Sequence, residues 1–566
     1  MRAGAGAGAA PAVPGLARLV LAGRGDGPGI GMGQWGAFGY AVRYHFGYGR
    51  ILAHYYGGTH LTTLSALGRA SNPVLKVVLL ENLNLQTNVG YDPVVTSPSS
   101  FSVVSQPATS AVPPAAPPAS SPPTSVPAAT SKGPTTAVTG GGPSGTGTSG
   151  GAGPTGAPGP APAPSHFVVP AGMAVDLHLE PGGTWSAFEG ASCAAAAAAA
   201  LAGGRPVATG LVDPVAEPPS TSPSAPPPRL LTVCRHDHVD ATLRGAIQAF
   251  DRQGYERTLN LVPLESYLRG VVPGEVSPSW GSDGTTAGTP QGQPWGFQAL
   301  EAQAVAARSY ALAMAASGGW MGYADICDST YCQAYVGVSY ESPATDAAVA
   351  ATAGQVLVED AAPSQVVLAR YAASSGGWTA PSAFPAVADL GDACVVPGNP
   401  LECNPVHTWQ LAIPATTLAQ AFPGLGAVRA VQVVQRDHVG PLGGRVLSVR
   451  VAGSRTSELV PASTFVADLG LYSDWFSVVP SGPSGGTSGS PPGTSGTSGT
   501  SGGVTGSSGA TTSTTTSTTT STTPTTTTST TTSTIPTTTT MLPATSTTTA
   551  TAPGGGAARR GLPGSP

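Results

Sequence analysis

The stretch Leu261-Val-Pro-Leu-Glu-Ser-Tyr-Leu-Arg-Gly-Val-Val-Pro-Gly-Glu-Val-Ser-Pro-Ser-Trp280 places one carboxylate, Glu275, in an apolar setting. Pro263 favours the start of a short helix, because its missing N–H has no intrahelical partner there, and Gly270 favours the end of that helix. The turn that follows sets Glu275 among valine, proline and tryptophan. Loss of solvation raises the pKa of a carboxyl group, which suits it to general acid catalysis. An ordinary buried or capping carboxylate is the alternative interpretation of Glu275.

A second helix is predicted at residues 297–316 (FQALEAQAVAARSYALAMAA), which contain neither Gly nor Pro and are rich in Ala. A stripe at three- and four-residue spacing combines apolar residues with Gln303 and Tyr310. An unpaired polar group costs free energy when it is buried, so a pure packing stripe would be apolar. We therefore expect these two side chains to serve a site, with a structural role as the alternative.

Several motifs follow one another in an order that resembles the SpoIID/LytB family, the sporulation stage II D protein and its relatives. They are GMGQWGAFGYA, LVPLESYLRGVVPGEV, ALEAQAVAARSYALA, DICDSTYCQAYVGV, TDAAVAATAGQVLV and YAASSGGWT. The resemblance covers mainly residues 23–60 and 255–477. It implies an α+β fold with a few helices on antiparallel β-structure, and it aligns Glu275 with the catalytic glutamate of the family.

The resemblance implies a lytic transglycosylase that cuts the glycan strands of peptidoglycan. One carboxyl group is enough for that reaction: as an acid it protonates the leaving glycosidic oxygen, and as a base it deprotonates the C6 hydroxyl of the sugar, which closes a 1,6-anhydro ring. Most glycosidases use two carboxylates, whereas Glu265 and Glu301 are expected in solvated helix positions. LytB-type relatives imply the alternative, a non-catalytic modifier of an N-acetylmuramoyl-L-alanine amidase. A purely structural wall protein is a third possibility.

Polar residues of the shared motifs are the expected contacts for sugar hydroxyl and acetamido groups. Residues 374–379 are predicted to form an exposed polar turn, and Arg308 is expected to bind a carboxylate or lactyl group unless it is merely solvated. Near the N-terminus, Asp26 and Pro28 stand where the family usually has Trp and His, although Gln34 matches. The expected substrate-binding residues are Gln34, Gln303, Arg308, Tyr310, Ser374, Ser375, Gly376, Gly377 and Thr379. No cofactor is expected.

Six cysteines fall into three neighbouring pairs, which favours local disulfides formed in an oxidising compartment. Buried free thiols are the alternative. For Cys327 and Cys332 zinc is a further alternative, but no His lies nearby in sequence, and two ligands do not make a zinc site, which needs three or four, so no metal site is predicted. The expected pairs are Cys193 with Cys234, Cys327 with Cys332, and Cys394 with Cys403.

Composition narrows the range of partners. Charged residues make up 9% of the 566 residues and the formal net charge is -5, which argues against a nucleic-acid-binding protein. No stretch reaches the length needed to span a membrane. We expect an extracytoplasmic protein, secreted or in the cell wall, although no secretory signal is recognisable in the sequence.

Low-complexity segments divide the chain, which holds 77 Gly and 57 Pro. The segments rich in Pro, Ser, Thr and Gly are expected to be disordered, because they lack the apolar residues of a core. The predicted divisions are an N-terminal element of the SpoIID-like body at 16–80, a disordered insertion at 106–165, a β-rich segment at 166–240 with a Pro-rich patch at 214–228, the core domain at 255–477 and a disordered tail at 478–566.

Overall fold

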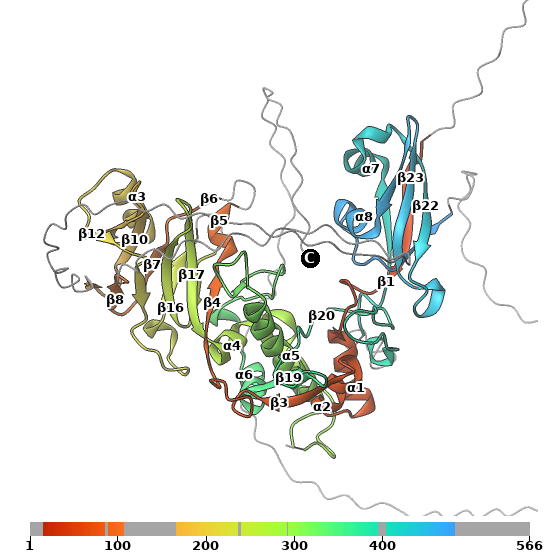
Figure 1. Ribbon diagram of the computed structural model, residues 1–566, viewed down its shortest axis with the longest axis horizontal. Helices are drawn as coiled ribbons and strands as arrows, with labels where there is room; N and C mark the ends of the chain where they lie inside the picture. Colours follow the sequence, from red (N-terminus) through yellow and green to blue (C-terminus); the bar gives the residue numbers. More distant parts are fainter. Residues whose placement is uncertain are drawn as a thin grey trace, which may run out of the picture. The chain divides into compact units, whose positions relative to one another are not determined.

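The computed structural model describes residues 15–84, 89–106, 166–235, 239–290, 292–393 and 403–480 (Figure 1). These residues form helices and mainly antiparallel sheets, so the predicted α+β class is confirmed. The predicted insertion lies outside the described residues except for Gln106, and the predicted tail lies outside them except for residues 478–480.

Two mainly antiparallel sheets account for most of the β-structure between residues 74 and 263. Val175 and Leu177 of one sheet and Ile247 and Ala249 of the other alternate with more polar residues and join the same hydrophobic core. The six-stranded sheet has the order β12 (Ala208–Leu211), β11 (Trp185–Gly190), β10 (Ala174–Leu179), β7 (Val94–Thr96), β14 (Leu231–Cys234) and β15 (Ala241–Leu243). The seven-stranded sheet has the order β18 (Ile326–Cys327), β4 (Val74–Val78), β17 (Glu256–Pro263), β16 (Ala246–Asp251), β13 (Val215–Glu217), β8 (Phe101–Val104) and β9 (His166–Val169), with β18 parallel to β4.

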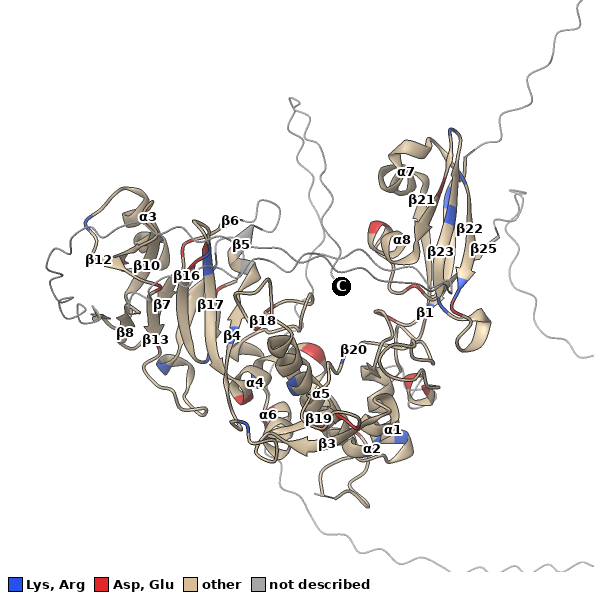
Figure 2. Cartoon of the chain, viewed as in Figure 1, with Lys and Arg blue, Asp and Glu red and all other residues tan. Residues whose placement is uncertain are grey.

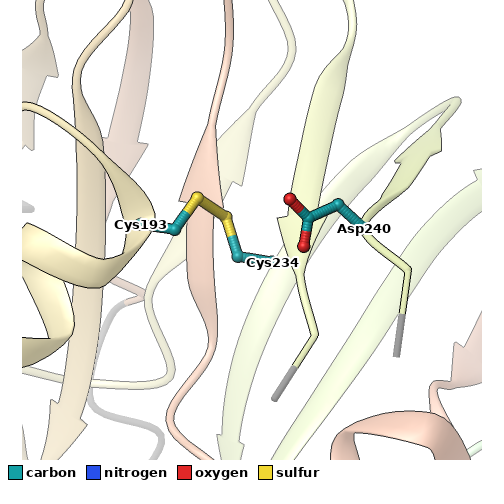
Figure 3. Close-up of side chains that lie close together, drawn as sticks. All are labelled: Cys193, Cys234 and Asp240. Atoms are coloured by element: carbon teal, nitrogen blue, oxygen red, sulfur yellow. A yellow bond between two sulfur atoms is a disulfide. The ribbon is translucent and has the colours of Figure 1, made fainter. Parts of the chain in front are cut away.

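The short helix α3 (Cys193–Leu201) packs on the six-stranded sheet, where Ala196 contacts Val94 and Ala174 in a small separate cluster. The disulfide predicted between Cys193 and Cys234 is present and joins α3 to β14 (Figure 3). Asp240 lies beside the two sulfur atoms. Because the sulfurs are bonded to each other, they are not thiolate ligands for a metal.

Helix α5 (Phe297–Ala316) is the longest described helix, with both ends where the sequence predicts them. It contacts helices on several sides and is buried on almost every face, rather than along one stripe, because its many alanines let neighbours approach closely. Its helical neighbours are α1 (Gln34–Tyr44), α2 (Tyr48–Tyr55), α4 (Leu264–Glu275) and α6 (Pro343–Ala351). Two short strand pairs accompany these helices, β3 (Thr59–Thr63) with β19 (Gln355–Glu359) and β2 (Met32–Gly33) with β20 (Tyr371–Ala372). A third pair, β5 (Leu83–Asn84) with β6 (Val89–Gly90), lies beside β17.

Helix α4 does not end at Gly270, as the sequence predicts, but continues through Pro273 to Glu275. A Cβ at position 270 would lie 2.6 Å from Cε2 of Tyr335. The ring of Tyr335 in turn packs on Tyr267 at 4.9 Å between centroids. Gly270 therefore makes room for a packed tyrosine and is not a stop signal.

The last part of the predicted core domain has a hydrophobic core of its own. Strand β1 (Arg18–Arg24) pairs with β21 (Thr408–Pro414) on one edge and with β25 (Phe476–Val479) on the other, so the N-terminal strand joins the C-terminal segment. The remaining elements of this core are α7 (Ala415–Ala421), β22 (Val428–Arg436), β23 (Val446–Gly453), β24 (Ser457–Pro461) and α8 (Ala462–Leu469). The sequence could not show this division, because it depends on pairing across nearly 400 positions.

Charged side chains are sparse along the described chain, and Lys and Arg are scattered over many elements (Figure 2). Among the described helices, none combines the length and the apolar character that a bilayer crossing demands.

Candidate active site

The carboxyl of Glu275 lies at the C-terminal end of α4, on the wall of a cavity of about 280 Å³. The extension of α4 beyond Gly270 is what carries this side chain to the cavity. A short 3₁₀ turn at Pro278–Ser282 follows and contributes the next part of the wall. The cavity is lined by Gln34, Trp35, Glu275, Val276, Ser277, Ser279, Trp280, Asp283 and Ala373.

Two donors hold the Glu275 carboxyl. The backbone N–H of Ala334 donates to Oε1 at 2.6 Å, and Nε2 of Gln34 donates to Oε2 at 3.3 Å. Burial raises the pKa of Glu275, and hydrogen bonding by Ala334, Gln34 and Tyr371 opposes part of that shift. The negative end of the α4 dipole also disfavours a charged carboxylate at this position. Glu275 therefore keeps its proton to a higher pH than an exposed glutamate does, as a general acid must.

Two glutamine amides connect three helices at this carboxyl. Gln34 begins α1, and its Nε2 lies 3.5 Å from Oε1 of Gln303 on α5 as well as beside Glu275 on α4. Gln303 is fully buried, and its Nε2 has no hydrogen-bond partner within the described part of the chain. A buried amide donor without a partner is costly. Gln303 does not line the cavity itself and is connected to it through Gln34.

Tyrosines form the other side of the carboxyl's surroundings. The hydroxyl of Tyr371 donates to Oε1 of Gln333 at 2.7 Å, and Nε2 of Gln333 donates to the carbonyl of Ala307 at 3.3 Å. The ring of Tyr310 lies 6.3 Å from that of Tyr371 and is partly exposed. Burial, with a contribution from the charge of Glu275, raises the pKa of Tyr310. The structure thus brings Tyr310 into the neighbourhood of Glu275, as the sequence suggests.

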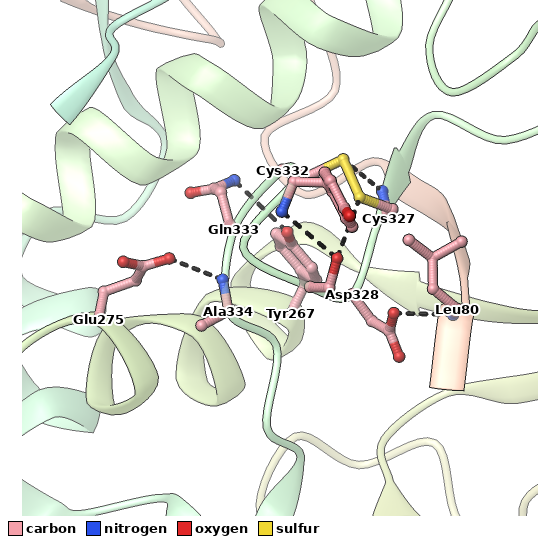
Figure 4. The surroundings of a disulfide bond; sticks show 10 residues. Leu80, Tyr267, Glu275, Cys327, Asp328, Cys332, Gln333 and Ala334 are labelled. Carbon is pink, nitrogen blue, oxygen red and sulfur yellow. Dashed lines mark hydrogen bonds between the residues drawn. A yellow bond between two sulfur atoms is a disulfide. The ribbon is translucent and has the colours of Figure 1, made fainter. Parts of the chain in front are cut away.

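The predicted disulfide between Cys327 and Cys332 closes the loop that leads to Ala334 (Figure 4). Asp328 anchors the same loop, because its Oδ1 accepts the Leu80 N–H at 2.8 Å and its carbonyl accepts the Tyr335 N–H at 3.0 Å. The disulfide and this anchor fix the backbone that presents the Ala334 N–H to Glu275. Cys403 is also disulfide-bonded, while its predicted partner Cys394 lies outside the described residues.

The exposed turn predicted at residues 374–379 is wrong, because the hydroxyl groups of this segment are buried and already bonded. Ser374 donates to Oδ2 of Asp392 at 2.9 Å, and Ser375 donates to Oδ2 of Asp389 at 2.8 Å. The Thr379 hydroxyl accepts the Val387 N–H at 2.8 Å. Gly376 and Gly377 adopt positive φ angles of 75° and 102°, which fit a tight turn. This segment supports the site instead of lining it.

Arg308 is likewise not available to a substrate. Its guanidinium is fully buried and makes a bidentate ion pair with Glu265, at 2.9 Å and 2.7 Å. The expected solvated position of Glu265 is thereby corrected, and Glu301 is buried as well. Both carboxylates belong to the packing of α5 and not to the cavity.

Sequence reasoning missed three contributors to the site. Ala334 acts through its backbone N–H, which no side-chain pattern reveals. Trp35 lines the cavity and contacts Trp280 edge to face at 5.1 Å between centroids, while Trp280 stacks on Phe38. Asp283 places a second, partly exposed carboxylate on the cavity wall.

Comparison with known proteins identifies one region. Residues 252–358 match the family model described as SpoIID, Stage II sporulation protein. The matched range includes Glu275, α5 and the loop closed by the Cys327–Cys332 disulfide, but not Gln34. No curated protein and no solved structure matches the chain.

Proposed function

Because this chain carries a SpoIID domain over residues 252–358, we propose that it acts on the bacterial cell wall as a lytic transglycosylase of peptidoglycan, with Glu275 as its single acid and base. The domain itself associates the chain with sporulation and the cell wall. The Cys193–Cys234 and Cys327–Cys332 disulfides support an oxidising, extracytoplasmic location. Peptidoglycan strands are the proposed substrate.

The observation that carries the proposal is the environment of the Glu275 carboxyl. It faces a cavity, burial raises its pKa, and two fixed donors orient both of its oxygens. In the first step the protonated carboxyl donates its proton to the glycosidic oxygen as the C1–O bond breaks. In the second step the resulting carboxylate takes the proton of the C6 hydroxyl while O6 bonds to C1, so the glutamic acid is regenerated without added water.

Three polar side chains around this carboxyl are proposed to bind the sugar. Gln34 and Gln303 supply amide groups suited to acetamido and hydroxyl groups, and Gln303 Nε2 has no hydrogen-bond partner within the described residues. Tyr310 supplies a partly exposed hydroxyl. Trp35 adds an aromatic surface in the cavity wall that can contact the face of a sugar ring.

Asp283 gives a second candidate function a structural basis. A hydrolytic glycosidase uses one carboxyl as acid and another as base or nucleophile, and Asp283 shares the cavity with Glu275. The products distinguish the two reactions, because transglycosylation leaves 1,6-anhydro-muramoyl ends and hydrolysis leaves reducing ends.

The test is digestion of intact and peptide-stripped peptidoglycan followed by mass spectrometry of the products. Glu275→Gln should lower release of anhydro products at least about a hundredfold, with an unchanged melting temperature. Asp283→Asn should still release the anhydro products. Asp360→Asn, which changes an exposed ion pair with His60, is the control and should have wild-type activity.

Two results would contradict the proposal. Reducing ends that disappear in Asp283→Asn would identify a hydrolase. If the wild-type protein releases no sugar, and wild type and Glu275→Gln stimulate a cell-wall amidase equally, the protein is a non-catalytic modifier.

A further inference from the structure

A second cluster of ionisable side chains lies in the six-stranded sheet, on elements that do not contribute to the Glu275 cavity. Asp176 and His178 are two residues apart on β10, so they share one face of the strand. Asp176 pairs with Val94 in the register of β10 and β7, and the Leu177 N–H bonds to the Pro93 carbonyl at 3.1 Å. Continuing this register two residues beyond the Asp176–Val94 pair sets Asp92 opposite His178. There, His178 Nδ1 and Asp92 Oδ2 are 2.8 Å apart.

The carboxylates of this cluster are buried without enough partners. Asp176 is 1% exposed. Its Oδ1, and Oδ1 of Asp92, have no hydrogen-bond partner within the described residues. Leaving a buried carboxylate oxygen unpaired costs free energy, and two such oxygens close together cost more.

A third carboxylate increases the negative charge of the cluster. Glu256, at the start of β17, lies near enough to Asp92 and Asp176 for the charges of the three carboxylates to interact. His178 and Arg257 supply the opposing positive charge to these groups. The carboxylates thus outnumber the cations around them.

From this arrangement we propose that Asp92, Asp176 and His178 bind one divalent metal ion, with Glu256 as a neighbouring carboxylate. One donor atom from each of the three residues lies within 4.8 Å of the others. Two ligands of one metal ion, each about 2.0–2.3 Å from it, lie up to about 4.5 Å apart. A small movement of these side chains would therefore bring the three donor atoms to the distances at which they can bind one ion.

The donor set favours a transition metal. Calcium and magnesium sites are built from oxygen ligands, whereas an imidazole nitrogen beside carboxylates suits zinc and also manganese. The cluster lies on the face of the sheet that Val94 and Ala174 share with α3. The ion would therefore connect β7 and β10, and its role would be structural. This inference does not depend on the proposed activity.

The experiment uses the full chain after treatment with a chelator. Zn²⁺, Mn²⁺, Ca²⁺ and Mg²⁺ are titrated separately by calorimetry, and the melting temperature is measured with and without each ion. Wild type should bind one equivalent of Zn²⁺ or Mn²⁺. At a hundred times Kd the ion should raise the melting temperature by roughly 5–10 °C.

Asp176→Asn keeps the shape of the side chain and removes its charge, so it should weaken binding at least about tenfold and abolish the thermal shift. Glu189→Gln is the matched control, because Glu189 lies on the adjacent strand β11 opposite Val175, whose side chain points to the other face. The control should bind as wild type does. His178→Gln provides a second test that does not rely on the folding of Asp176→Asn.

Three outcomes would overturn the proposal. One is that no ion binds to wild type at millimolar concentration. Another is that Asp176→Asn and His178→Gln bind the ion as tightly as wild type, which would place binding elsewhere on the chain. The last is that Asp176→Asn stabilises the chelator-treated protein while no ion shifts the wild type, which would identify Asp176 as a neutral, protonated acid.

Discussion

The ion pair between Arg308 and Glu265 is the part of the structure that a single substitution tests most directly. Arg308 is 0% exposed and Glu265 is 21% exposed at the side chain. Besides its two bonds to Glu265, the guanidinium donates to the carbonyls of Gln355 at 3.2 Å and Val349 at 3.3 Å. Glu265 also accepts the Gly354 N–H at 3.1 Å. Glu265→Gln leaves this geometry nearly intact but removes the countercharge.

The expected loss follows from the burial of the arginine. Breaking a buried ion pair by removing one partner costs about 3–5 kcal/mol, because the remaining charge stays out of water. Glu265→Gln keeps one acceptor oxygen and Glu265 is partly exposed, so we expect the lower end, about 3 kcal/mol. For a domain of this size that corresponds to a fall in melting temperature of roughly 6–12 °C.

Urea and thermal unfolding of full-length protein measure this loss. The matched control is Asp360→Asn, since His60 and Asp360 form an ion pair whose side chains are 49% and 58% exposed, and exposed pairs contribute about 0–1 kcal/mol. The double variant Glu265→Gln with Arg308→Met should recover part of the stability, because it removes the stranded charge. The reasoning is refuted if Glu265→Gln costs no more than the control. It is also refuted if Arg308→Met leaves stability unchanged while raising KM for glycan.

Three further predictions concern packing, pH and disulfides. Gly270→Ala should destabilise the protein by about 1–3 kcal/mol in urea unfolding, despite the better helix propensity of Ala, because the new Cβ would meet the Tyr335 ring; a gain in stability would contradict the packing of Tyr335. Burial and the nearby Asp392 charge raise the pKa of Asp389 from its ordinary 3.8 to about 8, so the folded state holds an extra proton between these values and stability should fall as pH rises from about 4 to about 8. Asp389→Asn should flatten that decline in urea midpoints measured across this range, and an equally steep decline would show that other groups cause it. Removing the Cys193–Cys234 bond, which spans 41 positions, should lower the free energy of unfolding by about 4 kcal/mol, whereas removing Cys327–Cys332, which spans 5, should lower it by about 2 kcal/mol. The Cys→Ser variants are compared by urea unfolding, and equal losses would argue against the chain-entropy account.

Local chemistry in the sequence was sufficient for the features that depend on neighbours in the chain. The Ala-rich run without Gly or Pro predicts α5 with both of its ends, since helix propensity is summed over adjacent residues. The five-residue spacing of Cys327 and Cys332 predicts their disulfide, because a short loop keeps the two sulfurs close. The apolar residues around Glu275 predict the direction of its pKa shift, which burial indeed raises.

Features that depend on distant partners could not be predicted in the same way. An arginine or a serine has the same local pattern whether it faces solvent or a buried carboxylate. The sequence therefore predicts substrate contacts for Arg308 and Ser374, whereas in the fold these side chains bond to Glu265 and Asp392. Gln34 lies 241 positions from Glu275, and only the family resemblance pointed to it. The sequence by itself therefore determined the α+β class, the central helix and the isolated carboxyl, because these follow from short-range propensity and burial. Tertiary structure alone decided which polar groups remain available at the cavity. A hydrogen bond or ion pair to a residue far away in the chain occupies a polar group, and the sequence around that group gives no sign of it.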